Sequence, residues 1–141
     1  MIASGADTLI PFIDYADPNN WWDPTTKRFT PNVGGYYLVY LSVWWANGSL
    51  ANTQSNTQIR KNGASVALFQ HTIDTSIGYT MGGTRIVYLN GTTDYLEFTA
   101  YTSNTTSQTI VKGTADGSGT NFSATLITTG SGLTGATGIT G

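Results

Sequence analysis

The feature that most constrains the fold is the alternation of residue types in short runs separated by turn-forming sequences. β-Branched and aromatic residues dominate these runs, and apolar residues at helical spacing are missing. Runs of this kind, bounded by Gly, Pro, Asn and Asp, are typical of strands. We expect strands at 8–13, 27–30, 36–45, 53–60, 65–71, 84–89, 95–102, 106–112 and 122–128. About nine or ten short strands without a helix predict an all-β sandwich or jelly roll.

Composition excludes several classes of protein. The 141 residues include no cysteine and one histidine, which excludes a disulfide scaffold, a thiolate metal site and a cysteine nucleophile. Only 10% of residues are charged and the net charge is −2, so the basic surface that nucleic acid requires is missing. No run is long enough to span a membrane, and the first residues lack the pattern of a signal peptide. We therefore expect one folded domain with no cofactor, no nucleic-acid partner and no membrane insertion.

Two segments predict particular local structures, a strand that is covered on both faces and a tight hairpin turn. Tyr36–Trp45 is apolar at positions that face both ways from a strand, so both of its faces should be covered. Gly34 and Gly35 supply the backbone freedom for entry into this strand. Asn62-Gly63 predicts a hairpin turn of the primed type.

Four segments of the chain, in this order, are similar to the motifs of one family. They are Trp22–Leu38 with its Phe29-Thr30 and Gly34-Gly35-Tyr36 steps, Arg60–Gly63, Gly82–Leu89 with Asp94–Phe98, and Asn121–Ile127. Together they resemble the C1q/tumour-necrosis-factor-like jelly roll family, in its C1q-like branch, over about residues 9–128. The resemblance implies a ten-strand jelly-roll β-sandwich that forms a homotrimer. Ala124 departs from the glycine that is usual in the family.

The resemblance and the strand alternation together divide the chain and indicate its core. We expect an N-terminal arm over residues 1–7, a C1q-like jelly roll over 8–129 and a collagen-like tail over 130–141. The expected core residues are Phe29, Tyr36, Leu38, Leu96, Phe98, Phe122 and Leu126.

The tail has glycine at every third position, at Gly132, Gly135, Gly138 and Gly141. Only glycine fits at the axis of a collagen triple helix, so this period predicts collagen-like winding. A flexible Gly/Thr tail that matches by chance is the alternative. In animal complement proteins the collagen-like part precedes the jelly roll, and the reversed order here looks more like phage structural proteins.

The strand at 95–102 indicates a subunit interface. Leu96, Phe98 and Ala100 lie on one face of this strand, whereas Tyr95, Glu97, Thr99 and Tyr101 lie on the other. The second face is too aromatic for a solvated surface, and tyrosine is enriched at interfaces. We therefore expect the trimer interface to contain the residues Tyr95, Glu97, Tyr101 and Trp45. A half-covered outer face is the alternative, and the pairs Trp21-Trp22 and Trp44-Trp45 also allow stacking on carbohydrate.

Candidate catalytic and metal-binding residues are few. His71 has no nucleophile motif near it, so we expect no enzyme. Asp14, Asp17 and Asp23 are close in sequence and could bind calcium, and some C1q-like domains bind this ion. Asp17-Pro18 and Asp23-Pro24 are also ordinary turn openers, which we favour, so we expect no metal site.

These observations favour a non-enzymatic, trimeric structural protein of a phage virion, either a head decoration, a head fibre or a tail-fibre module. Its expected partners are its own copies, other virion proteins such as the capsid, and a glycan or receptor on the host surface. A collagen-like glycoprotein of a bacterial cell or spore surface is one alternative. A carbohydrate-binding lectin is another.

Overall fold

The computed structural model of the chain describes residues 1–46, 53–73, 78–114 and 118–129. These residues form nine strands and no helix, and therefore no helix that could cross a membrane. The strands are β1 (Thr8–Leu9), β2 (Trp22–Asp23), β3 (Arg28–Phe29), β4 (Gly35–Trp45), β5 (Thr53–Lys61), β6 (Ala64–Ile73), β7 (Tyr79–Leu89), β8 (Leu96–Thr102) and β9 (Asn121–Thr128). The expectation of an all-β chain is confirmed. Residues 130–141, for which collagen-like winding was predicted, lie outside the described part.

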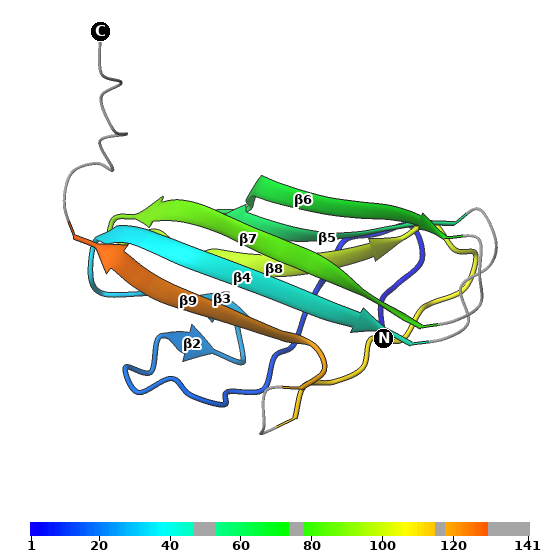
Figure 1. The fold of residues 1–141 in the computed structure, drawn as a ribbon, viewed down its shortest axis with the longest axis horizontal. Coiled ribbons are helices and arrows are strands. Elements are labelled where there is room, and N and C mark those ends of the chain that lie inside the picture. The colour runs from blue at the N-terminus through cyan, green and yellow to red at the C-terminus, as the bar shows by residue number, and fades with distance from the viewer. Residues whose placement is uncertain (47–52, 74–77, 115–117, 130–141) are drawn as a thin grey trace, which may run out of the picture.

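Two antiparallel sheets face each other (Figure 1). One has the strand order β2-β3-β8-β5-β6, with β1 also paired to β8. The other has the order β7-β4-β9, so β4 is its central strand and β7 and β9 are its edges. Strands that are far apart in the sequence are therefore neighbours in both sheets, which is compatible with a β-sandwich.

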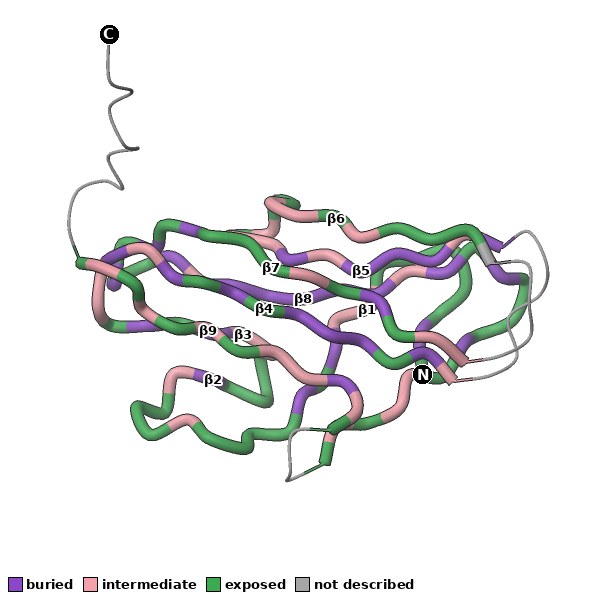
Figure 2. Tube along the Cα trace, viewed as in Figure 1, coloured by how far each residue is buried: buried purple, intermediate pink, exposed green. Residues whose placement is uncertain are grey.

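The core fills the space between the sheets, and the alternation along the strands decides which residues enter it. In β4 every second side chain is fully buried, as Figure 2 shows along the tube. In β8 the inward residues are Leu96, Phe98 and Ala100, of which none is more than 1% exposed. The fully buried residues of β4 are Tyr37, Val39, Leu41, Val43 and Trp45.

Two core expectations for β4 are wrong for the single chain. Leu38 is 42% exposed, and Tyr36 is half-buried on the same outward side of the strand. Because β4 is apolar at both parities, its sequence leaves open which side faces the other sheet. The structure places Phe29, Leu96 and Phe98 in the core, and Phe122 and Leu126 pack against it while remaining half-buried.

The strand count also differs from the expected ten. The segment 106–112 forms only isolated bridges, through Gln108 to Ile2, Ile110 to Trp45 and Lys112 to Thr120. The segment therefore contacts first the N-terminal residues and then the end of β4, but it forms a continuous hydrogen-bonded ladder with neither. In contrast, Trp22–Asp23, which was not predicted as a strand, forms β2 and pairs with Arg28–Phe29. Ile2, which was expected to lie in an N-terminal arm, is buried and only 1% exposed.

The predicted turns have the expected backbone geometry. Asn62 and Gly63 between β5 and β6 both have positive φ, at 51° and 82°, as a primed hairpin requires. At the start of β4, a Cβ atom on Gly35 would lie 2.3 Å from the carbonyl oxygen of Thr128 in β9. Only glycine therefore allows this approach of β4 to β9.

Asp94 ties two turns together at one end of the sandwich. Its Oδ1 accepts a hydrogen bond from the Asn62 side-chain amide at 2.7 Å. Its Oδ2 accepts from the Asn90 backbone N–H at 3.0 Å and lies 2.8 Å from Lys61 Nζ. Burial alone would raise the pKa of this carboxyl, but the bonds from Lys61, Asn62 and Asn90 outweigh it and lower the pKa below 3.8.

We expect Phe29→Ala to lower the free energy of unfolding by about 3–5 kcal/mol, because it leaves a cavity in the core. The Phe29 ring packs edge-on against Trp21, Tyr37 and Phe122 at centroid distances of 5.9, 6.1 and 6.1 Å. Denaturant titration checks this. Tyr15→Ala, at a side chain that is 62% exposed, should change the value by no more than about 0.5 kcal/mol. A loss below about 1 kcal/mol for Phe29→Ala would show that the ring is not core.

We expect Asp94→Asn to destabilise the chain at neutral pH by about 1–3 kcal/mol, since it weakens three contacts of a buried carboxylate. Because folding lowers the pKa of Asp94, its ionised form stabilises the fold above the ordinary value of 3.8. This contribution is lost as the pH falls through the lower pKa of the folded state. Denaturant titrations of both proteins across acidic pH should therefore converge, and a constant difference would contradict the role of the charge.

Candidate assembly surface

The outward face of the β7-β4-β9 sheet carries large apolar side chains that this chain leaves in contact with solvent. We call it the apolar face and define it by five residues that are 41–45% exposed. They are Leu38, Tyr40, Trp44, Ile86 and Tyr88. Exposed large apolar side chains gathered on two neighbouring strands are unusual for a monomer and are typical of a protein contact.

The register of the strands explains how these side chains come together. Leu38 lies opposite Ile86, and Tyr36 lies opposite Tyr88 with their ring centroids 5.2 Å apart. On the β9 side, the outward residues of β4 lie opposite the polar residues Asn121, Ser123, Thr125 and Thr128. None of the described residues paired on this outward side is charged. The apolar face therefore lacks the charges that usually keep a sheet surface in water.

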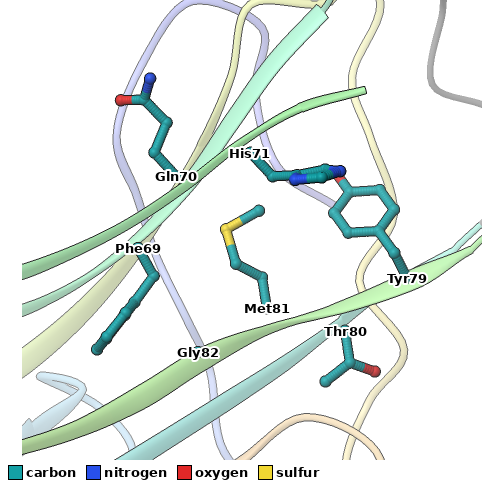
Figure 3. Close-up of a pocket in the computed structure, with 7 residues that line it drawn as sticks. All are labelled: Phe69, Gln70, His71, Tyr79, Thr80, Met81 and Gly82. Atoms are coloured by element: carbon teal, nitrogen blue, oxygen red, sulfur yellow. The ribbon is translucent and has the colours of Figure 1, made fainter. Parts of the chain in front are cut away.

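A cavity of about 500 Å³ opens beside the apolar face, between the edge strands β6 and β7. We call it the mouth cavity (Figure 3). His71, Tyr79 and Met81 point into it, while Gln70 points away. The Tyr79 ring stacks on the buried Trp45 at 5.9 Å and lies 6.0 Å from the His71 ring.

The mouth cavity and the apolar face meet along β7. Thr80 and Gly82 line the cavity, and in the register of the sheet they lie opposite Trp44 and Ser42 of β4. The mouth cavity is therefore adjacent to the apolar face along the β7 edge of the sheet.

The face of β8 that was expected to form the trimer interface is largely closed by the chain itself. Glu97 is 7% exposed, and its carboxylate lies 3.6 Å from Arg28 Nε and 3.8 Å from Arg60 Nε. The Arg28 guanidinium also lies over the Tyr95 ring at 4.0 Å, which leaves Tyr95 half-buried. Tyr101 is half-buried as well. Two arginines from strands distant in the sequence thus cover a face of β8 that was expected to be free for contact with another subunit.

The expected place of Trp45 in the trimer interface is also wrong. Its side chain is 0% exposed and belongs to the core, so it cannot meet another subunit. The neighbouring Trp44 is 44% exposed on the apolar face. Trp45 was expected at the interface, but the structure buries it in the core and exposes Trp44 instead.

Two of the three candidate calcium ligands, Asp17 and Asp23, accept hydrogen bonds within turns. The Asp17 carboxylate accepts a hydrogen bond from the Trp22 backbone N–H at 2.6 Å. The Asp23 carboxylate accepts bonds from the Thr26 hydroxyl at 2.8 Å and the Thr25 backbone N–H at 2.7 Å, which lower its pKa. In the described ranges, no group of three acidic, histidine or cysteine residues gathers into a metal-binding cluster, Asp14 included.

Comparison with known proteins adds no second line of argument about function. The sequence matches no protein-family model and no curated protein in the comparisons made. The geometry of the described surfaces therefore carries the functional argument.

The sequence contained a signal for the apolar face that sequence reasoning missed. The alternation of Tyr36–Trp45 showed two apolar rows, and both were assigned to covered surfaces. Only the strand order and the burial of the described residues, none of which form a layer over the outward side of the β7-β4-β9 sheet, show that one row is open.

We expect Glu97→Ala to lower the free energy of unfolding by about 1–3 kcal/mol, because it leaves Arg28 and Arg60 without their shared carboxylate. The same variant should keep the oligomeric state of the unchanged protein, since the buried Glu97 contacts only residues of its own chain among those described. Denaturant titration and light scattering check the two outcomes. A fall in oligomer mass without a loss of subunit stability would show that the β8 face forms the interface after all.

Proposed function

We propose that this protein is a non-enzymatic structural component of a virion and assembles as a homotrimer through its apolar face. The uncharged apolar face on the central strand β4 is the observation that carries the proposal. Burying aromatic and aliphatic side chains between subunits would remove this surface from water.

A threefold assembly requires two different surfaces on each protomer. When a patch meets its own copy, the result is a twofold dimer, whereas a ring of three needs a heterologous contact. The apolar face and the mouth cavity supply two such surfaces, one with the exposed side chain of Trp44 and one hollow with Met81 and Tyr79. In the proposed trimer, the apolar face of each protomer packs against the mouth cavity of the next.

The virion setting is supported by the C1q-like resemblance and by the composition. The chain has few charges, no cysteine and many Thr, Ser and Asn residues, a composition shared by many extracellular β-proteins. In density-gradient fractions of particles, the protein should sediment with the capsid protein. Recovery with bacterial envelope or spore material instead would favour the surface-glycoprotein alternative.

We expect the unchanged protein at micromolar concentration to have three times the 15.0 kDa chain mass by light scattering. The double variant Leu38→Glu with Ile86→Glu should be monomeric, because assembly would bury carboxylates that have no partner. Ile13→Glu is a matched control, since Ile13 is 42% exposed, as is Leu38, but lies off the apolar face.

Two results would contradict this assembly. A monomer or a twofold dimer of the unchanged protein would exclude the trimer. A trimer that persists in the double variant would show that another surface holds the subunits together. Circular dichroism of each variant separates loss of assembly from loss of folding.

A further inference from the structure

A second hollow follows the other edge of the same sheet, along β9. It has a volume of about 710 Å³ and lies between β9 and the segment 12–22, and we call it the β9 groove. In Figure 1, β9 is the edge of its sheet at the side where β2 and the N-terminal segment pass. Its volume is within the range of small-molecule sites in proteins.

The inner wall of the β9 groove is aromatic and held in place by ring packing. Phe12 contacts Trp22 and Phe122 edge-on, at centroid distances of 5.6 and 4.8 Å. Trp22 lies 5.1 Å from Phe122, and Trp21 packs edge-on against Phe29 at 5.9 Å. The Asp17 carboxylate fixes the backbone at Trp22. The groove is therefore formed before any ligand arrives, which lowers the entropic cost of binding.

The rim of the groove has a different chemistry. Tyr15 is 62% exposed there and presents an aromatic ring. Asp14 and Asn19 are exposed beside it, and Ser123 and Thr125 are exposed on β9. No lysine, arginine or histidine is among the described residues that line the groove.

We propose that the β9 groove binds a neutral oligosaccharide. Sugar rings present apolar C–H faces that stack on aromatic rings such as Tyr15, and hydroxyls that donate to carboxylate and amide oxygens such as those of Asp14 and Asn19. The two lining carboxylates, Asp14 and Asp17, repel anionic sugars, and no lining cation compensates for them. The site is distinct from the apolar face, so it extends the assembly function and does not depend on it.

The main competing occupant is an extended peptide that adds a strand to the open edge of β9. The rim chemistry favours a sugar, because strand addition needs backbone groups of β9 and does not call for the side chains of Asp14, Tyr15 and Asn19. The two occupants make different demands on these side chains, so substitutions distinguish them.

The test is a titration of the full-length protein with cellopentaose, chitopentaose and maltopentaose, with tetragalacturonate as an anionic comparison. Amide chemical shifts of residues 12–22 and 121–126 and tryptophan fluorescence report binding. At least one neutral probe should bind saturably with a Kd of millimolar or below, and tetragalacturonate should bind at least tenfold more weakly. Tyr15→Ala and Asp14→Ala should each weaken the neutral probe at least tenfold, whereas Tyr101→Ala, a half-buried tyrosine outside the groove, should leave it unchanged.

Three results would overturn the proposal. One is the absence of saturable shifts with all three neutral probes up to 20 millimolar. Another is binding that survives Tyr15→Ala and Asp14→Ala. The third is binding of a strand-forming peptide at β9 that neither substitution affects. Light scattering of both groove variants should still show the mass of the unchanged protein, so failure of this site is separable from failure of the assembly.

Discussion

The rest of the structure depends on the position of β4 at the centre of a three-stranded sheet, of which the described residues cover one face. Its inward row is fully buried and forms the middle of the core, and its outward row stays about half exposed. Full burial of a large apolar side chain stabilises by about 1.5–3 kcal/mol, so the apolar face retains on the order of 5 kcal/mol per protomer that association could recover. In the proposed trimer, the inward row of β4 would serve folding and the outward row would serve the contact between subunits.

This double use also explains what sequence reasoning could and could not predict. In β8 one parity is aliphatic and aromatic and the other mixed, so Leu96 and Phe98 were assigned to the core without the structure. In β4 both parities are apolar, and the choice between Trp44 and Trp45 depends on which sheet lies opposite, a nonlocal fact. The closure of the β8 face depends on Arg28 and Arg60, which reach Glu97 from β3 and β5. No local sequence pattern predicts contacts between strands that are so far apart in the chain.

Turns were the most predictable part, because their chemistry is local. Asn62-Gly63 adopts positive φ since few other residue pairs tolerate it, and Asp23 closes its own turn with its carboxylate. The same locality explains why the calcium interpretation competed with the turn interpretation. Both use the lone pairs of the same carboxylate oxygens, either to coordinate the ion or to accept hydrogen bonds from nearby N–H and O–H groups. The segment 106–112 shows the opposite limit, since its alternation resembles a strand but its partners are single residues on separate elements.

The mouth cavity and the β9 groove lie at opposite edges of the β7-β4-β9 sheet. The β9 groove is lined by none of the five residues of the apolar face and by none of those that line the mouth cavity, so an assembly through those two surfaces can leave the groove open. Each trimer would then present three β9 grooves in a fixed arrangement. Three linked sites raise the effective concentration of each for a multivalent surface, so sites of only millimolar affinity could hold a particle on a glycan-coated cell. Weak binding in a single groove is therefore consistent with strong attachment, provided that the apolar face first brings three chains together.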